Sequence, residues 1–138
     1  MADKIATRES YGKALAEFGA IYPNLVVLDA DLAAATKTGT FKKAFPDRFF
    51  DCGIAENNMI AAAVGMSLCG KIPFASSFAM FAAGRSFEQV RNAIHYQLET
   101  DDPRYEWLNH TFCIGFGVAK FTDPVVVRYD VYAVRTKK

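Results

Sequence analysis

The sequence predicts a three-layer α/β/α fold with a mostly parallel sheet. Apolar runs of strand length alternate along the chain with longer segments of helical periodicity, and these runs are continuous rather than alternating. Continuous apolar runs are typical of parallel strands, because helices cover both faces of such a sheet. Ligands bind beyond the carboxyl ends of the strands in folds of this class, so we expect functional residues directly after the strands.

The first helix is expected to begin with Thr7 as its capping residue and to end near Gly19. Apolar residues between these two positions recur every three or four residues, which is the helical period. The apolar run of residues 25–28 predicts a central strand that follows this helix. Asp29 and Asp31 mark the carboxyl end of that strand, where we expect a site.

The next elements continue the alternation. Residues 33–47 predict a loop and then a short helical turn held by two phenylalanines. Residues 48–54 predict a second strand, and residues 55–68 predict a helix whose small residues indicate burial on more than one face. Residues 72–76 predict a third strand and residues 84–97 another helix.

The alternation of helix and strand then stops. Two further strands are expected at residues 111–117 and 125–134. Partial alternation of apolar residues in the second indicates an antiparallel or edge strand, so the two are expected to form an atypical β-hairpin. We therefore divide the chain into a first unit, residues 1–97, and an atypical β tail, residues 98–138.

The composition is that of one globular domain with almost no net charge. Its 138 residues include 16 Lys and Arg against 15 Asp and Glu, and 51% are hydrophobic. A net charge of +1 provides no broad electrostatic field for nucleic acid or anionic membranes. No apolar run approaches the roughly 18 to 20 residues that span a bilayer, and the first residues lack the apolar stretch of a signal peptide. We expect a cytoplasmic protein that binds neither nucleic acid nor membrane.

The cysteines and histidines are isolated from one another in the sequence. Cys52, Cys69 and Cys113 lie singly in apolar stretches without a CxxC pair, and His95 and His110 lie at no metal-ligand spacing from them. Free cysteine behaves as a small buried hydrophobe. We therefore expect core cysteines and no metal site in this chain.

The first candidate for chemistry is Glu56, in the segment GIAENNM between the second strand and the next helix. A carboxylate in the first turn of a helix commonly does no more than complement the helix dipole, which contributes some tenths of a kcal/mol. Here the polar group lies between an apolar strand and a helix of small residues, at the end of the sheet where sites form. We expect Glu56 to be functional.

The second candidate is the pair Phe78 and Phe81, which follow the third strand. Two aromatic rings three residues apart can present their faces to a planar heterocycle, although aromatics at this spacing are also common in cores. The alanine, serine and glycine residues around them leave room for a flat ligand, and they equally permit close helix packing. Both interpretations stay open at this point.

These segments together resemble the pyrimidine-binding domain of transketolase, and most of all the carboxy-terminal subunit of split transketolases. The resemblance covers about residues 3–96. The segments that carry it are KIATRESYGKAL, LDADLA, FFDCGIAENNM and GKIPFASSFAMFAAGRSFEQVRNAI. The Asn-Asn-Met continuation and the FASSFAMF segment favour transketolase over related thiamine enzymes.

The resemblance implies thiamine diphosphate as the cofactor. In that family a glutamate beside N1′ of the aminopyrimidine ring favours the reactive tautomer, and Glu56 is the matching position. Phe78 and Phe81 match the aromatic residues that stack on the ring. Asp31 and Leu32 match strand-end positions near the cofactor.

The resemblance also implies a sugar phosphate substrate, because Arg8 matches a basic position that contacts it in family members. The alternative is that Arg8 is a solvated arginine in a first helical turn. Two positions depart from the family pattern: Gly84 stands where a further aromatic is common, and Ala35 stands near a phosphate-contacting serine.

The implied function is transfer of a two-carbon ketol unit between sugar phosphates, together with a partner chain. The chain has no Gly-Asp-Gly segment followed by an Asn about 25 to 30 residues later, the pattern with which resembling proteins hold magnesium and the diphosphate. A diphosphate-binding transketolase subunit is therefore expected to hold the magnesium, in a homo- or hetero-oligomer. The alternative is a catalytically inactive truncated or chimeric remnant that acts at most as an interaction module.

The tail leaves a further choice open. The family pattern continues with a fourth parallel strand and a histidine-bearing loop, which His110 does not match. From about residue 101 the tail more nearly resembles the carboxy-terminal hairpin of a small β-barrel family of unknown function. Either the chain is a chimera or fusion, or residues 111–117 and 125–129 stand in for the missing strands of the sheet.

Overall fold

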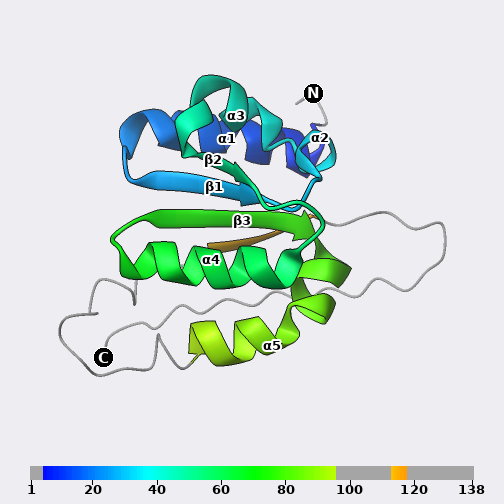
Figure 1. Ribbon diagram of the computed structural model, residues 1–138. Helices are drawn as coiled ribbons and strands as arrows, with labels where there is room; N and C mark the ends of the chain where they lie inside the picture. The colour runs from blue at the N-terminus through cyan, green and yellow to red at the C-terminus, as the bar shows by residue number, and fades with distance from the viewer. Residues whose placement is uncertain (1–4, 96–112, 118–138) are drawn as a thin grey trace, which may run out of the picture.

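A computed structural model describes residues 5–95 and 113–117 of the 138-residue chain. These residues form a parallel sheet with helices on both faces, which confirms the predicted α/β fold (Figure 1). The elements are, in chain order, α1 Thr7–Ile21, β1 Leu25–Asp29, α2 Ala33–Thr36, α3 Gly39–Ala44, the 3₁₀ turn η1 Pro46–Arg48, β2 Phe49–Asp51, α4 Glu56–Leu68, β3 Ile72–Phe78, the π-helical segment η2 Met80–Arg85, α5 Phe87–Gln89, the π-helical segment η3 Val90–His95 and β4 Cys113–Gly117.

Among the described residues the sheet has four strands in the order β2-β1-β3-β4, and each neighbouring pair is parallel. The register places Asp29, the last residue of β1, opposite Asp51 in β2 and Ser76 in β3. Because the strands are parallel, their carboxyl ends meet at one edge of the sheet. The loops that follow β1, β2 and β3 therefore lie next to one another.

Two apolar clusters cover the two faces of the sheet, because side chains alternate along a strand. Val26 and Leu28 of β1 pack against α4, whereas Leu25 and Val27 pack with residues of α1 and α3. Figure 1 shows α1, α2 and α3 on one side of the sheet and α4 and α5 on the other. This arrangement explains why the apolar run of β1 is continuous.

Helix α1 differs from its prediction at both ends. Ala6 is its N-cap residue and no side chain caps it, so the prediction of a Thr7 cap is wrong. Gly19 does not end the helix but is buried inside it, where a Cβ atom would lie 2.6 Å from the Phe41 ring and 2.7 Å from the Phe45 ring. Gly19 therefore serves close packing, and the helix ends before Pro23, whose ring cannot continue it.

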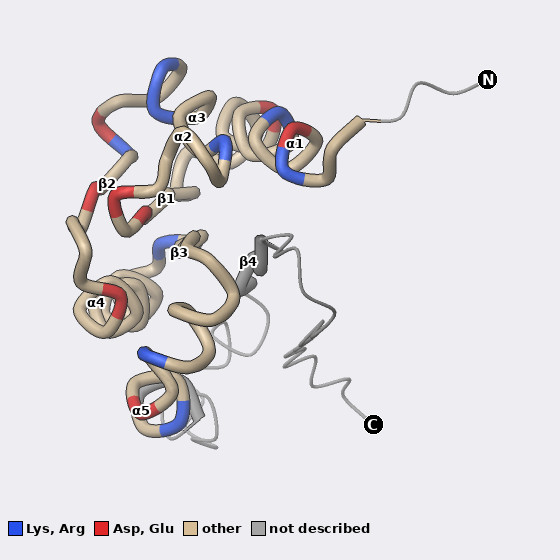
Figure 2. Tube along the Cα trace, turned by 90° about the vertical axis from the view of Figure 1, so that its right-hand side faces the viewer, with Lys and Arg blue, Asp and Glu red and all other residues tan. Residues whose placement is uncertain are grey.

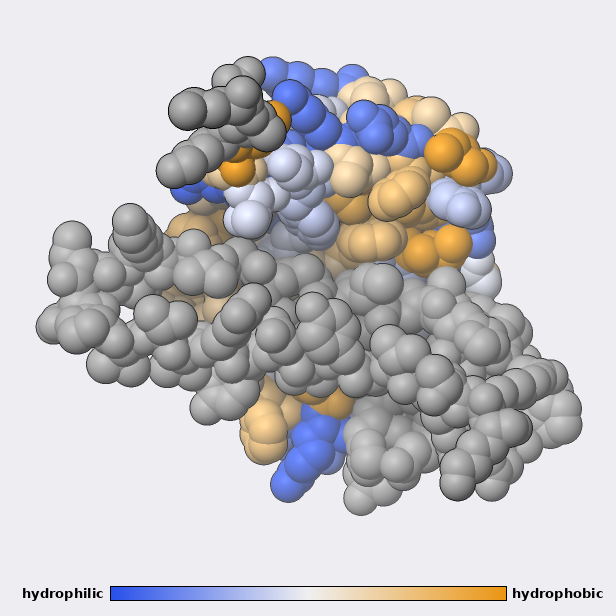
Figure 3. All heavy atoms as spheres, turned by 180° about the vertical axis from the view of Figure 1, so that it is seen from behind, coloured by the Kyte–Doolittle hydropathy of each residue, from blue (hydrophilic) through white to orange (hydrophobic). Residues whose placement is uncertain are grey.

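The end of α1 that lies away from the strand tips carries exposed apolar side chains. Phe18, Ile21 and Tyr22 are 46%, 65% and 48% exposed, and the rings of Phe18 and Tyr22 lie 6.3 Å apart. Figure 3, seen from behind, shows hydrophobic residues in orange gathered on the right-hand part of the described surface. The apolar position Phe18 fits the helical period, but the period alone did not indicate that it lies beyond the core.

Helix α4 packs on more than one side. Glu56, Met59, Ile60 and Ala63 are buried, and the helix contacts β1 and β3 of the sheet as well as η2, α5 and η3. This agrees with the expectation of burial on more than one face. Ala61 is exposed, so the helix is not enclosed all round.

Strand β2 and the helix after β3 also differ from their predictions. The second strand is short because Gly53 has a φ of 65°, a conformation that ends an extended segment. The helix predicted over residues 84–97 is helical as far as residue 95, but it consists of the short α5 flanked by two π-helical segments, and residues 96–97 lie outside the described residues. π-Helical turns are rare and occur often at functional sites.

The tail contributes one strand to the described structure. β4, Cys113–Gly117, pairs in parallel with β3 from Phe74 to Phe78. Of the two alternatives for the tail, this pairing favours a strand that stands in for the missing one. The expected second strand, residues 125–134, and His110 lie outside the described residues, and the division into residues 1–97 and 98–138 stays a prediction.

The cysteines do not all lie in the core. Cys52 is half-buried, but Cys69 is exposed after the end of α4, so the expectation of a core residue is wrong for Cys69. Over residues 5–95 and 113–117, no three His, Cys, Asp or Glu side chains are grouped so that they could hold a metal ion. Within the same ranges no helix is long and apolar enough to cross a membrane.

Arg48 joins the end of α1 to the start of β2. Its Nη2 donates a hydrogen bond of 2.7 Å to the Gly19 carbonyl, and its Nη1 donates one of 3.0 Å to the Tyr22 carbonyl. Its guanidinium carbon also lies 4.0 Å from the centre of the Phe45 ring. The last carbonyls of a helix lack hydrogen-bond donors within the helix, and Arg48 supplies such donors here.

Arg48→Lys is expected to lower the free energy of unfolding by about 1 to 3 kcal/mol, because lysine cannot span both carbonyls and the ring. Urea denaturation followed by circular dichroism measures this change. Arg8→Lys, at an exposed position in the first turn of α1, is the matched control and should leave stability unchanged. Equal losses in the two variants would contradict the role given to Arg48.

Candidate functional site

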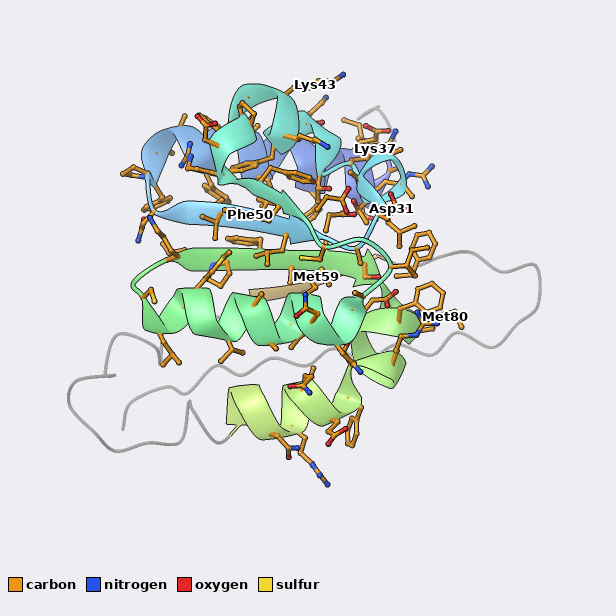
Figure 4. All side chains as sticks on the ribbon, in the orientation of Figure 1. Asp31, Lys37, Lys43, Phe50, Met59 and Met80 are labelled. Atoms are coloured by element: carbon orange, nitrogen blue, oxygen red, sulfur yellow. The ribbon has the colours of Figure 1, made fainter. Side chains whose placement is uncertain are left out.

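The predicted site residues come together at the carboxyl edge of the sheet. Asp31 and Leu32 follow β1, Glu56 opens the helix after β2, and Phe78 ends β3. Figure 4 shows Asp31 and Met80, the first residue of η2, at this same end of the sheet. In Figure 2, which looks at this edge, acidic residues lie at the ends of β1 and β2 and at the start of α4.

Glu56 is a buried carboxylate with a charged partner. It is the first residue of α4 and only 1% exposed, and its Oε2 accepts a hydrogen bond of 3.0 Å from Nη1 of Arg85. A charge is buried at acceptable cost only when it is paired and hydrogen-bonded, and the positive end of the helix dipole adds to that pairing. Complementing a helix dipole needs no such burial, so Glu56 does more than that.

Phe78 and Phe81 form an aromatic surface that Arg85 connects to this carboxylate. Their rings are stacked, with centroids 6.1 Å apart and planes inclined by 29°. Both side chains are half-buried, and neither belongs to the two core clusters of the sheet. The guanidinium carbon of Arg85 lies 5.0 Å from the centre of the Phe81 ring, so Arg85 connects the aromatic pair to Glu56. The rings are therefore not simply part of the core.

The segment Asp31–Leu32 is held by a second buried carboxylate, Asp29. Oδ1 of Asp29 accepts a hydrogen bond of 2.6 Å from the Leu32 N–H, and Oδ2 accepts bonds of 2.8 Å from the hydroxyls of Thr36 and Thr38. Burial raises the pKa of Asp29, and the three hydrogen bonds offset this only in part. The same turn places Asp31 in the left-handed region, with a φ of 59°.

Asp51 links this turn to the loop that leads to Glu56. Its Oδ1 accepts hydrogen bonds from the N–H groups of Asp31, at 3.2 Å, and Gly53, at 3.0 Å.

Burial, together with the nearby carboxylates of Asp51 and Asp29, raises the pKa of the Cys52 thiol. Cys52 is therefore held as a thiol, which is a poor nucleophile. The carboxylates, and not the thiol, are therefore the groups at this edge that can take part in a reaction.

Arg8 lies at the same edge but on its own element. It is exposed in the first turn of α1, next to Glu9, which pairs with Lys37 at 3.0 Å. The hydroxyl groups of Tyr11 and Ser76 lie 2.8 Å apart, and this contact holds the start of α1 against the end of β3. The contact of Arg8 with a sugar phosphate stays a prediction.

Sequence reasoning missed three residues of this edge. Arg85 lies four positions after Phe81, a spacing that places the two on one helical side, but nothing in the sequence indicated its pairing with Glu56. Asp29 was expected to mark the strand end, not to anchor the turn after it. Ser77 of β3 is 1% exposed, and its hydroxyl has no hydrogen-bond partner among the described residues.

Comparison with known proteins places this geometry in a family. Residues 3–100 match the transketolase pyrimidine-binding domain family. The chain belongs to this family. The resemblance found in the sequence over residues 3–96 is thereby confirmed. Residues 71–134 also match a family described as a protein of unknown function, DUF3237, which overlaps the end of the first match.

Relatives of this transketolase pyrimidine-binding domain extend over more of the transketolase chain. A Methanocaldococcus jannaschii protein described as a transketolase C-terminal section is 56% identical over 89 residues, which are 64% of this chain and 28% of that protein. Human transketolase is 47% identical over 92 residues, which are 66% of this chain and 15% of the human protein. The matched segment therefore spans less than a third of these relatives.

A solved structure shares the fold of the transketolase pyrimidine-binding domain seen here. It is described as a split-gene transketolase, an inactive beta4 tetramer, and it superposes with a TM-score of 0.60 at 63% sequence identity. The match covers 66% of this chain and 30% of that one. The parallel sheet with helices on both faces is thus the fold of this family.

Thr38→Val is expected to lower the free energy of unfolding by about 1.5 to 3 kcal/mol at pH 7, because it removes a donor from the buried Asp29 carboxylate. The pKa of Asp29 is higher in the folded than in the unfolded chain. The stability that Asp29 contributes through its raised pKa is therefore fully present below its unfolded-state pKa of 3.8, and it is lost as the pH rises through its folded-state pKa. The loss in Thr38→Val should be smaller at pH 4, where Asp29 carries less charge.

Urea denaturation at the two pH values measures this difference. Thr40→Val, at an exposed position two residues further on, is the matched control and should leave stability unchanged at both. A loss in Thr38→Val that is the same at pH 4 and pH 7 would show that the hydroxyl does not act on the charge of Asp29.

Proposed function

We propose that this chain is the pyrimidine-binding half of a thiamine diphosphate-dependent transketolase. In this proposal it transfers two-carbon ketol units between sugar phosphates together with a diphosphate-binding partner chain. The observation that carries the proposal is the buried Glu56 carboxylate, joined through Arg85 to the stacked rings of Phe78 and Phe81, in a member of the transketolase pyrimidine-binding family.

The residues present fit the aminopyrimidine half of thiamine diphosphate. That half is a flat heteroaromatic ring with polar atoms at its rim, and the site offers a stacked aromatic surface and a carboxylate. The hydroxyl of Ser77, buried without a partner in the part of the chain that the structure describes, adds a polar group at the same end of β3. An orphaned buried hydroxyl is uncommon and indicates a missing partner.

Each residue of the site has a definite task in this proposal. Bound thiamine diphosphate supplies the nucleophilic carbon that carries the two-carbon unit. Glu56 forms the hydrogen bond at N1′ of the ring and holds the proton there, and its burial strengthens that bond. Phe78 and Phe81 orient the ring and exclude water from it, and the turn at Asp31 completes the edge.

Apolar side chains around the site support a partner chain. Ile54, Met80 and Phe87 are 74%, 56% and 61% exposed, and they lie on the segments that begin α4, η2 and α5. Large exposed apolar side chains that gather in one place are typical of an interface. The relatives described as a C-terminal section and as a split-gene transketolase support a partner chain. In this proposal the partner holds magnesium and the diphosphate.

A second candidate function is a catalytically inactive remnant that acts as an interaction module. Two observations favour it: the solved relative is described as an inactive tetramer, and residues 71–134 match a different family. In this alternative the domain keeps its fold and its apolar surface and performs no turnover. The two candidate functions differ in the role of Glu56, which is needed for turnover in the first and takes part in no reaction in the second.

Glu56→Gln is expected to abolish measurable ketol transfer, a loss of about 100-fold or more, because an amide cannot hold the proton at N1′. The full chain is mixed with the amino-terminal section of a split-gene transketolase, thiamine diphosphate and Mg²⁺, and transfer between sugar phosphates is followed. Glu17→Gln, at an exposed position of α1, is the matched control and should keep full activity. A wild type without activity would favour the inactive remnant.

The chain alone is expected to bind thiamine diphosphate with negligible affinity, because the proposal places the diphosphate and magnesium on the partner. Isothermal titration calorimetry of the chain with cofactor and Mg²⁺, with and without the amino-terminal section, measures this. Binding should become measurable only when both chains are present. Micromolar affinity for the chain alone would contradict the division of the site between two chains.

A further inference from the structure

Arg85 reaches both functional groups of the proposed site. Its Nη1 donates a hydrogen bond of 3.0 Å to Oε2 of Glu56, and its guanidinium carbon lies 5.0 Å from the centre of the Phe81 ring. The Arg85 side chain is 51% exposed, whereas that of Glu56 is 2% exposed. One half-exposed cation thus connects the buried charge to the aromatic surface.

The backbone at the end of η2 is arranged so that Arg85 faces this way. The N–H of Ser86 donates a hydrogen bond of 3.1 Å to the carbonyl of Phe81, and its buried hydroxyl donates one of 3.4 Å to the same carbonyl. This wide turn fixes Arg85 relative to Phe81, and wide helical turns of this kind gather at functional sites. The contact with Glu56 is therefore held by the backbone and not by the long arginine side chain alone.

A carboxylate can accept about four hydrogen bonds, two at each oxygen. The donor from Arg85 is directed at Oε2 of Glu56, and it fixes the rotation of the carboxylate plane. With the plane fixed, Oε1 has one defined direction in which to meet a second group. A free carboxylate would have to lose this rotational freedom each time the second group binds.

We propose that Arg85 is a positioning residue, which orients the Glu56 carboxylate toward the aminopyrimidine ring and keeps Phe81 stacked on Phe78. This inference rests on the proposed function of the chain. It assigns Arg85 no contact with the cofactor or the substrate. The competing arrangement, in which Arg85 occupies the place of the ring and blocks it, predicts the opposite change in cofactor affinity.

The contact itself is tested on the full chain alone by NMR of its arginine side chains. In the wild type the Nη groups of Arg85 should give separate signals, because the ion pair restricts rotation of the guanidinium. In Glu56→Gln these signals should merge, as for a free arginine. Arg91→Met, at an exposed position after α5, is the matched control and should leave the Arg85 signals unchanged. Merged signals in the wild type would overturn the inference.

The role is tested in the mixture with the amino-terminal section, thiamine diphosphate and Mg²⁺. Arg85→Met keeps the apolar stem over Phe81 but removes the donor, and we expect kcat to fall about 10- to 100-fold, the equivalent of one charge-assisted hydrogen bond. The KM for the sugar phosphate should stay within about twofold, because Arg85 touches no substrate. Arg85→Lys should restore part of kcat, and Arg91→Met should keep all of it.

Calorimetry supplies a readout apart from activity. The dissociation constant of the cofactor should rise in Arg85→Met, because the carboxylate is no longer fixed before binding. A lower dissociation constant would show that Arg85 blocks the site and would overturn the inference. If the wild type is active and Arg85→Met has the same kcat, the role given to Arg85 is overturned, whereas the proposed function is not. A wild type without activity would overturn the proposed function and this inference together.

Discussion

The parallel register of β1 with β2 and β3 is the constraint on which the site depends. It brings Asp29, Asp51 and Ser76 side by side at one edge of the sheet. The candidate residues lie at the end of β3 or on the loops and helical segments next to this edge. A shift by one residue would turn each side chain of β1 to the other face, which the apolar clusters on both faces forbid. The hydrophobic core therefore fixes the position of polar residues that take no part in it.

Two carboxylates are buried at this edge, and their surroundings give them different tasks. Asp29 is enclosed by hydroxyls and an N–H from its own loop, and the partners Thr36 and Thr38 are themselves buried. These three bonds all come from the segment that follows β1, so Asp29 holds the turn together. Glu56 has a half-exposed partner, Arg85, which in turn lies over the half-buried ring of Phe81. A buried charge that faces replaceable partners can exchange hydrogen bonds with a ligand, whereas an enclosed one cannot.

The sequence predicted the strands and Glu56 because these depend on local composition. Continuous apolar runs identify central strands, and a polar group directly after such a run identifies an edge where ligands bind. The contact of Arg85 with Glu56 joins residues 29 positions apart, and it depends on the path of the chain through η2. Gly19 was misread for the same reason: its role comes from the rings of Phe41 and Phe45 across the helix interface, not from its neighbours in sequence.

The tail matters to the site through β3. This strand carries Ser76, Ser77 and Phe78, and its central residues are buried. A buried strand whose backbone faced no neighbour would leave N–H and C=O groups without partners, which costs free energy for each group. β4 pairs with β3 from Phe74 to Phe78, so it supplies those partners along the part of the strand that reaches the site. Whatever the origin of the tail, this strand pairs with the backbone of β3 on the side away from β1, up to Phe78 of the aromatic pair.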